Sequence, residues 1–245
     1  MKDEASWRPT KFVFDSTGLR ASRDPAAVAV QSRMTADLTA GFMERALREH
    51  AAGALLDLGC GTVPLYEAYR PYVAEVHCID WGNSPHSVDH VDVQHDLTQP
   101  LPFVDSRFDT ILLSDVLEHL PEPESLWREL ARVLVPGGKV ILNVPFLYWL
   151  HEEPFDYYRY TQFALCRFAE KSGFRVIEIT PLGGAAEVVT DIIGKALPRH
   201  RYGRWTSVLL QWMCTRFSGT GIGKRFRIRT GKRMPLAYGM IAQRL

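Results

Sequence analysis

The sequence predicts an α/β fold in which a single doubly wound sheet is covered by helices on both faces. Two observations lead to this prediction. From residue 54 onward, short apolar runs alternate with helical or polar stretches. Several of these runs are apolar throughout, as expected of strands that are buried on both faces. The 245 residues are enough to bury one large core.

Two segments precede this alternation. Residues 1–30 show no periodicity, and we expect them to be irregular and to lie against the rest of the molecule. A helix is expected from Gln31 to His50, because apolar residues recur there at every fourth position (Met34, Leu38, Phe42 and Ala46).

Seven apolar runs are the predicted strands. They span residues 54–58, 75–79, 90–94, 110–113, 139–144, 174–179 and 236–242. A helix with one apolar and one charged face is expected from Glu124 to Leu134, and Pro136-Gly137-Gly138 should end it. A further helix is expected from Gln162 to Ser172, with Thr161 as its N-cap.

Cysteine usage and hydropathy exclude several classes of protein. The four cysteines have no Cys-x-x-Cys spacing, which argues against a zinc site or a disulfide framework and fits a reducing compartment. Residues 1–4 lack the apolar core of a signal peptide. The longest apolar stretch, residues 140–150, is interrupted by Asn143 and Pro145 and is too short to cross a bilayer. We therefore expect a cytoplasmic protein.

A glycine-rich turn follows the first predicted strand, which ends in Asp57-Leu58-Gly59-Cys60-Gly61-Thr62. Glycines let the backbone bend sharply and approach a ligand without a Cβ in the way. In doubly wound sheets, ligands bind beyond the carboxyl ends of the strands. Pro64 stands where the dinucleotide fingerprint has its third glycine, which disfavours a nicotinamide-dependent dehydrogenase. The turn alone leaves two cofactor classes open.

Acidic residues end or follow the next two predicted strands. Asp80 comes 19 residues after Gly61, and its carboxylate has the acceptors to bind both hydroxyls of a ribose. Asp96 follows the third strand, where it can accept a hydrogen bond from an adenine amino group. Taken singly, an aspartate at a strand end such as Asp80 is more often a helix cap or solvated, and Asp96 fits a solvated loop equally well.

The ordered set of motifs from Leu55 to Pro145 resembles class I S-adenosylmethionine-dependent methyltransferases of type 11. The motifs are the Asp-Leu-Gly-Cys-Gly turn, Asp80, the pair Asp96-Leu97, the segment Asp-Val-Leu-Glu-His-Leu at residues 115–120 and a helix followed by Val135-Pro136-Gly137-Gly138. They cover somewhat over a third of the chain. The resemblance implies a seven-stranded Rossmann-like sheet of order 3-2-1-4-5-7-6, with the last strand antiparallel and helices on both faces.

The resemblance also implies S-adenosyl-L-methionine as the cofactor and a set of residues that bind it. The methionine part would lie against the turn, and the ribose against Asp80. Trp81 would stack near the adenine, whose edge would meet Asp96 and Leu97. Ser114 and Asp115 would close the site from the fourth strand. The turn residues of this set are Asp57, Gly59, Cys60 and Gly61.

Candidate catalytic residues follow the fifth strand, at residues 145–161. A sulfonium methyl is already activated, but a hydroxyl acceptor needs a base of near-neutral pKa. His151 with Asp156 can form a base and its orienting group, and His119 is the rival base. An alternative is that Asp156 and Arg159 form a structural ion pair and that the aromatics are core. No cluster of metal ligands stands out, so we expect no metal site.

The motif His-x-x-Pro-x-Asp-Tyr-Tyr-Arg-Tyr-Thr, residues 151–161, resembles a bacterial subgroup of these methyltransferases that is found with surface-polysaccharide synthesis. The resemblance implies methylation of a hydroxyl group of a saccharide, a glycan or a lipid-linked glycan. Two alternatives stay open: a small-molecule methyltransferase, and a non-catalytic adaptor that binds S-adenosylmethionine.

Charge is distributed unevenly among the four predicted parts of the chain. We expect an N-terminal cap segment and helix (1–50), a cofactor-binding core (51–184), a basic helical insert (185–233) and the final strand of the core (234–245). The insert has eleven Lys and Arg against two acidic residues, a net charge of +9 that leaves −8 for the remainder.

Apolar residues recur at helical spacing within this insert (Trp205, Val208, Leu209, Trp212, Met213 and Phe217). A basic amphipathic helix suits peripheral contact with the inner face of a membrane. A lid over the site or a dimer interface fits the pattern equally well. No nucleic-acid partner is expected, because no binding motif for one is present.

Overall fold

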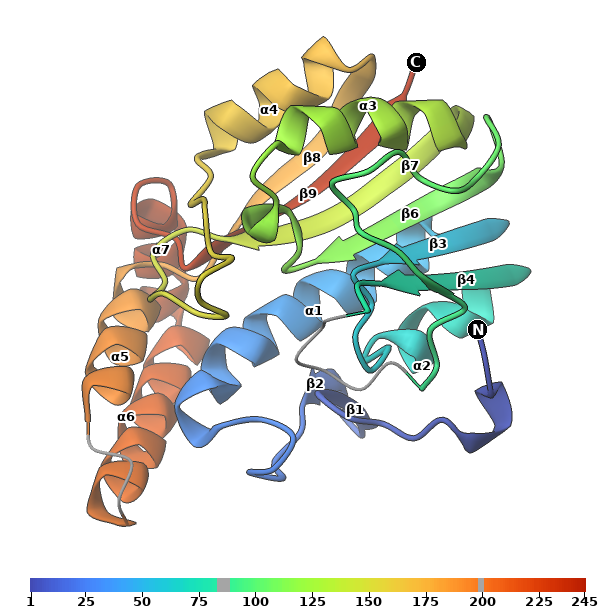
Figure 1. Ribbon diagram of the computed structural model, residues 1–245. Helices are drawn as coiled ribbons and strands as arrows, with labels where there is room; N and C mark the ends of the chain where they lie inside the picture. Colours follow the sequence, from blue (N-terminus) through green and yellow to red (C-terminus); the bar gives the residue numbers. More distant parts are fainter. Residues whose placement is uncertain (83–88, 198–200) are drawn as a thin grey trace.

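The computed structural model describes residues 1–82, 89–197 and 201–245, and a seven-stranded sheet forms its centre (Figure 1). The order of the strands is β5-β4-β3-β6-β7-β9-β8. Their bounds are β3 (Ala54–Leu58), β4 (Glu75–Asp80), β5 (Val93–Gln94), β6 (Phe108–Ser114), β7 (Leu134–Pro145), β8 (Phe174–Leu182) and β9 (Ala237–Arg244).

The strand directions confirm the predicted topology. The strands β5, β4, β3, β6 and β7 pair in parallel, whereas β9 is antiparallel to both of its neighbours, β7 and β8. This is the order 3-2-1-4-5-7-6 with an antiparallel last strand. Because parallel strands end at the same edge, the segments that follow β3, β4 and β6 meet there.

Helices cover both faces of the sheet, as a doubly wound fold requires (Figure 1). On one face α3 (Pro123–Val133) and α4 (Gln162–Lys171) pack on residues such as Leu56 and Leu113. On the other face α1 (Arg33–His50) and α2 (Tyr66–Tyr69) pack on residues such as Leu55 and Leu112. Successive strand residues thus enter opposite cores, which explains why the strands are apolar throughout. The described residues also form four short 3₁₀ turns (Glu4–Ser6, Val30–Ser32, Arg70–Tyr72 and Leu117–His119).

The expectation that residues 1–30 are irregular is wrong. They contain an antiparallel hairpin of β1 (Phe12–Asp15) and β2 (Gly18–Ala21). Carboxylates of α1 bind the outer edge of the hairpin: the Leu19 amide donates to Glu44 and the Ala21 amide to Asp37, at 3.0 and 2.9 Å. Helix α1 thus supplies the acceptors that a third strand would supply.

Element boundaries differ from the predictions at two places. Helix α3 ends at Val133, and the Pro136-Gly137-Gly138 turn lies within β7 instead of terminating the helix. The helix ends there because buried Leu134 is extended and pairs with Phe108 of β6. Strand β5 is only two residues long. The amide of Cys78 next to it donates to the Asp92 side chain, at 2.7 Å, where a longer strand would supply a backbone carbonyl.

The segment between β8 and β9 folds into α5 (Ala185–Ala196), α6 (Arg201–Gly219) and α7 (Gly221–Gly231). The buried Glu187 on α5 joins them, because it accepts from Ser218 of α6 at 2.5 Å and from Arg227 of α7 at 2.7 Å. Gln211 of α6 donates to the carbonyl of Val30, at 2.7 Å, and so attaches the three helices to the segment before α1. Among the described residues, no helix is long and apolar enough to cross a membrane.

Candidate functional site

The glycine turn after β3 has a backbone conformation that favours glycine. Gly59 and Gly61 have φ angles of +65° and +51°, a region that residues with a Cβ avoid. A Cβ on Gly59 would come within 2.6 Å of Val116. The amides of Gly59 and Cys60 donate to the Ile79 carbonyl at 2.9 and 3.2 Å, which fixes the turn against β4.

Asp80, at the end of β4, faces this turn. Its buried carboxylate accepts from the Gly61 amide and, at 2.6 Å, from the Trp81 amide. These two bonds orient the Asp80 carboxylate, a group that has about four acceptor positions and suits the hydroxyls of a ribose. The glycine turn and Asp80 together fit the nucleoside and methionine parts of S-adenosylmethionine.

Asp57 and Cys60 support the turn from behind. Asp57 is buried and accepts a hydrogen bond from the Tyr69 hydroxyl, at 3.2 Å. Burial raises the pKa of Asp57 to about 8, an effect that the Tyr69 hydrogen bond only partly offsets. The hydrogen bond with Cys78, together with burial, raises the pKa of the Cys60 thiol. Both side chains are therefore uncharged near neutral pH and suit a buried position under the turn.

Val63 adopts a left-handed conformation, with φ +53°, and is fully buried. A β-branched residue is strained there, and the strain is of the order of 1–3 kcal/mol. The N-terminal segment contacts this position, because the indole of Trp7 donates to the Val63 carbonyl at 3.2 Å. Thr10 and Thr62 are joined by their hydroxyls, at 3.0 Å. Residues 7–11 therefore cross over the turn, which the sequence did not indicate.

Beyond β5, Asp96 is exposed and accepts from the Thr98 amide at 2.9 Å, whereas the adjacent Leu97 is buried. Trp81 is half-buried, and its ring meets Phe155 edge-on with 5.1 Å between the centroids. The residues expected to contact an adenine thus lie in the loops after β4 and β5. The loop that carries Phe155 contacts the first of these at Trp81.

Ser114 and Asp115 end the fourth strand of the parallel set. Asp115 has a φ of +55°, and its carboxylate accepts a hydrogen bond from the side-chain amide of Asn143 at 2.6 Å. On its other side the Lys11 ammonium lies 3.2 Å away. A carboxylate held by groups from β7 and from the N-terminal segment closes the carboxyl edge of the sheet, next to half-buried Ser114.

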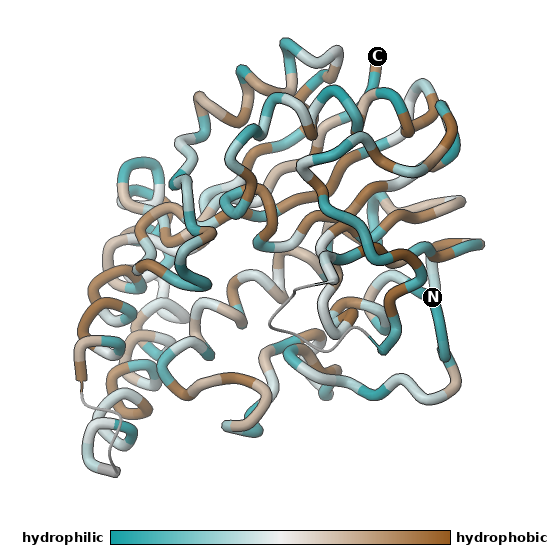
Figure 2. Tube along the Cα trace, in the orientation of Figure 1, coloured by the Kyte–Doolittle hydropathy of each residue, from teal (hydrophilic) through white to brown (hydrophobic). Residues whose placement is uncertain are grey.

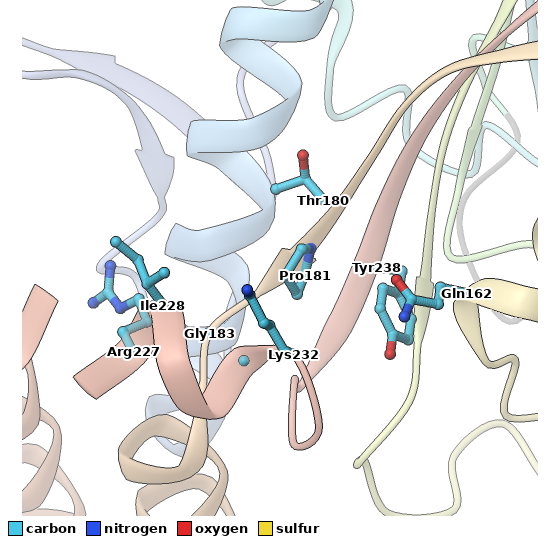
Figure 3. Close-up of a pocket in the computed structure, with 9 residues that line it drawn as sticks. Gln162, Thr180, Pro181, Gly183, Arg227, Ile228, Lys232 and Tyr238 are labelled. Atoms are coloured by element: carbon cyan, nitrogen blue, oxygen red, sulfur yellow. The ribbon is translucent and has the colours of Figure 1, made fainter. Parts of the chain in front are cut away.

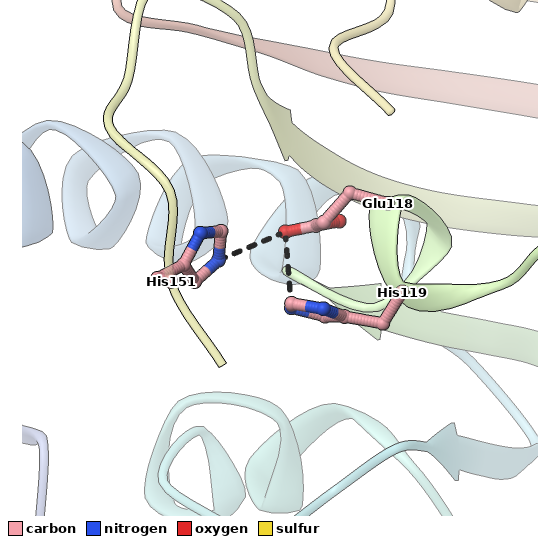
Figure 4. A group of neighbouring side chains, drawn as sticks. All are labelled: Glu118, His119 and His151. Carbon is pink, nitrogen blue, oxygen red and sulfur yellow. Dashed lines mark ion pairs between the residues drawn. The ribbon is translucent and has the colours of Figure 1, made fainter. Parts of the chain in front are cut away.

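Three polar side chains meet just after Asp115 (Figure 4). Glu118 lies in the 3₁₀ turn Leu117–His119 and is completely buried, and its Oε1 lies 3.8 Å from His119 Nε2 and 3.7 Å from His151 Nε2. Both distances are too long for a hydrogen bond. His119 and His151 thus point the same ring nitrogen toward one carboxylate oxygen. The sequence singled out both histidines but not Glu118, although it lies within the recognised Asp-Val-Leu-Glu-His-Leu motif.

Asp156 holds His151 and Arg159 together, so both interpretations of its role from the sequence describe real contacts. Its carboxylate lies 3.2 Å from His151 Nδ1 and accepts from Arg159 at 2.5 and 2.7 Å. Burial acts to raise the pKa of Asp156, but the hydrogen bonds from Arg159 and from the His151 amide outweigh it and hold the pKa at about 2. Burial acts to lower the pKa of His151, but Glu118 and Asp156 outweigh it and raise that pKa above its usual value.

The loop that carries these residues is anchored to the turn that carries Glu118. The amides of Tyr157 and Tyr158 donate to the Glu118 carbonyl, at 3.0 and 3.2 Å, and the Tyr160 hydroxyl donates to the Leu117 carbonyl at 2.9 Å. Only some of the aromatic residues at 145–161 belong to the hydrophobic core. Tyr160 is buried, whereas several other rings are exposed (Trp149, Phe155, Tyr157 and Tyr158). The ring that contacts His151 from this loop is that of Tyr148, with 5.4 Å between the centroids.

A cavity of about 530 Å³ lies elsewhere, between α7 and the edge formed by β8 and β9 (Figure 3). Gln162, Arg227, Lys232 and Tyr238 are among the residues that line it. The described residues around it include none of those that the sequence suggested for the cofactor or for catalysis. We therefore place the candidate active site at the carboxyl edge of the sheet.

Comparison with known proteins agrees with this location. The profile of a protein family described as a methyltransferase domain matches residues 56–142, which include the glycine turn, Asp80 and Glu118. Over this range the chain thus matches a methyltransferase domain. The family match and the cradle of glycines and Asp80 make S-adenosylmethionine the cofactor of this domain.

Curated relatives match this methyltransferase domain. The ubiquinone biosynthesis O-methyltransferase of Pseudomonas entomophila is 33% identical over 106 residues, which are 38% of this chain and 44% of that protein. An uncharacterized methyltransferase of Mycobacterium leprae is 39% identical over 80 residues, 31% of this chain and 29% of the relative. The chain thus spans less than half the length of the curated relatives it matches.

Solved structures resemble most of the methyltransferase fold. The [4+2]-cyclase SpnF superposes with a TM-score of 0.54 at 18% identity, over 85% of this chain and 82% of that one. A protein assigned as an S-adenosylmethionine-dependent methyltransferase from Listeria monocytogenes gives a TM-score of 0.53 at 14% identity, over 84% and 99% of the two chains. At these identities the likeness establishes the Rossmann-like fold.

Proposed function

We propose that the protein transfers the methyl group of S-adenosylmethionine to a hydroxyl group of a saccharide or glycan. The observation that carries this proposal is the contact between Trp81 and Phe155, whose ring centroids are 5.1 Å apart. Trp81 follows Asp80 of the cofactor cradle, and Phe155 belongs to the loop that carries His151. A candidate base and a candidate cofactor site therefore share one edge of the sheet.

S-adenosylmethionine supplies an activated methyl group, so the protein mainly has to align the acceptor and exclude water. The acceptor oxygen forms a bond to the methyl carbon while the carbon–sulfur bond breaks and leaves its electron pair on sulfur. A hydroxyl acceptor also gives up its proton, and a base of near-neutral pKa serves best for this.

We assign this proton to Nε2 of His151. The Asp156 carboxylate lies 3.2 Å from Nδ1, closer than the Arg159 guanidinium at 3.5 Å, and so favours the tautomer with the proton on Nδ1 and a lone pair on Nε2. Since the pKa of Asp156 is about 2, its negative charge persists at neutral pH and stabilises the imidazolium that forms. His119, the rival base, has at its Nδ1 the neutral Phe155 carbonyl, 2.9 Å away, instead of a carboxylate.

The cofactor roles that we propose follow the order of the strands. The turn after β3 would bind the methionine part, Asp80 the ribose, and the loops after β4 and β5 the adenine. The carboxyl end of β6 would close the site. The residues concerned are Asp57, Gly59, Cys60, Gly61, Asp80, Trp81, Asp96, Leu97, Ser114 and Asp115.

The exposed aromatic rings in the loop that carries the candidate base support a sugar acceptor. Trp149 and Tyr157 present flat apolar faces, and a tyrosine adds a polar edge, as sugar rings with their hydroxyls require. The motif at residues 151–161 and its resemblance to methyltransferases of polysaccharide synthesis agree with this choice. A small-molecule hydroxyl is the second candidate, favoured by the O-methyltransferase name of the Pseudomonas relative.

We further propose that the insert, residues 185–233, contacts an anionic membrane surface. Its net charge is +9. Figure 2 shows hydrophobic stretches along α5 and α6, and large apolar side chains of these helices are exposed instead of covering the site (Ile192, Ile193, Trp205, Leu209, Trp212 and Met213). Basic helices with exposed apolar side chains bind anionic lipid surfaces. A lipid-linked glycan would be presented at such a surface.

Methyl transfer from labelled S-adenosylmethionine to a panel of glycans and small hydroxyl compounds tests the proposed reaction. We expect label in a glycan ether, and no cofactor binding in calorimetry after Asp80→Ala. Asp96→Ala, which changes an exposed carboxylate, should weaken binding far less. A wild-type protein that binds S-adenosylmethionine but never turns over would instead be an adaptor.

A further inference from the structure

Two histidines and one carboxylate meet at the site in an arrangement that the proposed base does not explain (Figure 4). One ligand atom from each of Glu118, His119 and His151 lies within 4.8 Å of the other two, and this is the metal-ligand group found among the described residues. Two imidazoles and one carboxylate are a common set for divalent first-row transition metals. We infer that these three residues bind one such divalent cation.

The burial of Glu118 is the first argument. Its side chain is 0% exposed, and neither carboxylate oxygen accepts a hydrogen bond from any residue that the structure describes. A buried carboxylate without such partners is destabilising by several kcal/mol. A bound cation would supply the missing compensation, because it is a stronger partner than the two histidines at 3.7 and 3.8 Å.

The outer nitrogens of the two rings give the second argument. His119 Nδ1 donates to the Phe155 carbonyl at 2.9 Å, and His151 Nδ1 lies 3.2 Å from the Asp156 carboxylate. His119 thus turns the lone pair of Nε2 inward, and Asp156 is the nearer of two groups at His151 Nδ1, the other being the Arg159 guanidinium at 3.5 Å. Histidines that bind metals almost always carry such an acceptor on the other nitrogen, because it fixes the ring and its tautomer.

The distances agree with a shared cation. Bonds of about 2.0–2.2 Å in tetrahedral geometry put two ligand atoms roughly 3.4 Å apart. The observed 3.7 and 3.8 Å from Glu118 to the histidines exceed this only by a few tenths of an ångström. The Glu152 carboxylate lies 3.8 Å from His119 Nε2 and is close enough to contribute a fourth ligand.

The role of the cation in catalysis rests on the proposed function. A divalent cation lowers the pKa of a hydroxyl that binds to it, so a saccharide hydroxyl in an open coordination position would lose its proton to water. His151 Nε2 has one lone pair and cannot hold the cation and accept a proton together. In the cation-loaded protein His151 would therefore be a ligand, and it would act as the base only in the cation-free form.

Titration of Co²⁺ into the full-length protein, stripped with a chelator and dialysed, tests the site without any acceptor. We expect one equivalent to bind, with the visible absorption bands of Co²⁺ held by nitrogen and oxygen ligands in a low-symmetry site. Mn²⁺, followed by electron paramagnetic resonance, should compete for the same site.

Variants identify the ligands. Glu118→Gln and His119→Ala should each raise the dissociation constant for Co²⁺ at least about 100-fold, and Asp156→Asn about 10-fold, because outer partners typically contribute that much. His77→Ala is the matched control. His77 Nε2 also pairs with a carboxylate, that of Glu75 at 2.7 Å, but this pair lies on β4 and outside the proposed metal-ligand group. It should leave Co²⁺ binding unchanged. Retained binding of S-adenosylhomocysteine shows that a variant is folded. If His119→Ala does not fold, the isosteric variant Glu118→Gln still tests the cation site.

The outcomes separate this inference from the proposed function. One-equivalent binding that Glu118→Gln abolishes supports the cation site even if no methyl transfer is ever seen. Absence of saturable binding, or equal binding by wild type and Glu118→Gln, overturns the cation site. Full methyl transfer in the presence of chelator, together with that absence, leaves the proposed reaction intact and His151 as its base.

Discussion

Lys11 Nζ lies 3.2 Å from Asp115 Oδ2, so a side chain near the N-terminus reaches the carboxyl end of β6. The contact between Trp7 and the Val63 carbonyl lies in the same segment. Residues 7–11 therefore form one wall of the candidate cofactor site, although they lie outside the matched methyltransferase domain.

Lys11→Met should weaken binding of S-adenosylhomocysteine about fivefold, because a half-exposed ion pair contributes at most ~1 kcal/mol. Calorimetric titration measures the effect. Arg20→Met is the matched control, since Arg20 forms a similarly exposed pair with Asp15 within the hairpin, at 2.6 Å. Equal affinities of Lys11→Met and wild type would show that the segment does not form part of the site.

The pH dependence of methyl transfer should report His151. Its neutral form is needed as base or as ligand, and Glu118 and Asp156 raise its pKa above the ordinary 6.5. Activity should therefore fall as the pH drops through a value above 6.5. Asp156→Asn removes a negative charge beside the ring, so the acidic limb of kcat/KM should move to lower pH. An unmoved limb would exclude His151 as the titrating group.

Asp156 should also stabilise the fold. Its pKa falls from 3.8 to about 2, so its contribution is fully present above pH 3.8 and is lost as the pH falls toward 2. The shift corresponds to about 2 kcal/mol, and Asp156→Asn should lower the free energy of unfolding at pH 7 by that amount. Asp105→Asn, which changes an exposed partner of Arg132, should stay within about 0.5 kcal/mol. Urea denaturation checks both.

Two glycine substitutions separate backbone strain from a steric clash. Gly59 and Gly173 both have a positive φ, +65° and +81°. A Cβ on Gly59 would lie 2.6 Å from Val116, whereas a Cβ on Gly173 would meet no atom of the described residues within 4 Å. Gly173→Ala should cost about 1–2 kcal/mol in urea denaturation. Gly59→Ala should cost more and also weaken cofactor binding; equal costs would contradict the close approach of Val116.

Vesicle binding tests the membrane proposal. Sedimentation with vesicles of anionic phosphatidylglycerol should capture the protein, and vesicles of neutral phosphatidylcholine should not. Trp205→Glu and Trp212→Glu, on side chains 67% and 58% exposed, should reduce the bound fraction severalfold without unfolding. Val104→Glu is the matched control, because Val104 is 71% exposed but lies outside the insert. Equal losses in all three variants would argue against a specific face.

Local patterns predicted the sheet well because its strands are buried on both sides and read as continuous apolar runs. Asp80 was predictable for a related reason, since a residue that ends a parallel strand lies at the binding edge whatever surrounds it. The hairpin of β1 and β2 was missed because its outer edge depends on Glu44 and Asp37, two carboxylates of a later helix.

The Glu118 group was missed for a similar reason. His119 and His151 are 32 positions apart, and only the anchoring of the loop to the Glu118 carbonyl brings them to one carboxylate. Spacing alone contains no such information. At Val63 the sequence showed that the turn departs from a glycine-rich pattern. It did not show that the N-terminal segment contacts this position.

The position of β9 has a consequence for synthesis of the protein. β8 pairs with β9 and not with β7, so β8 has no partner in the central sheet until residues 237–244 have left the ribosome. The three helices of the insert emerge before this pairing is available, with their apolar side chains exposed. Folding of this half of the molecule must therefore wait until residues 237–244 have emerged, and chaperones have access to it in that interval.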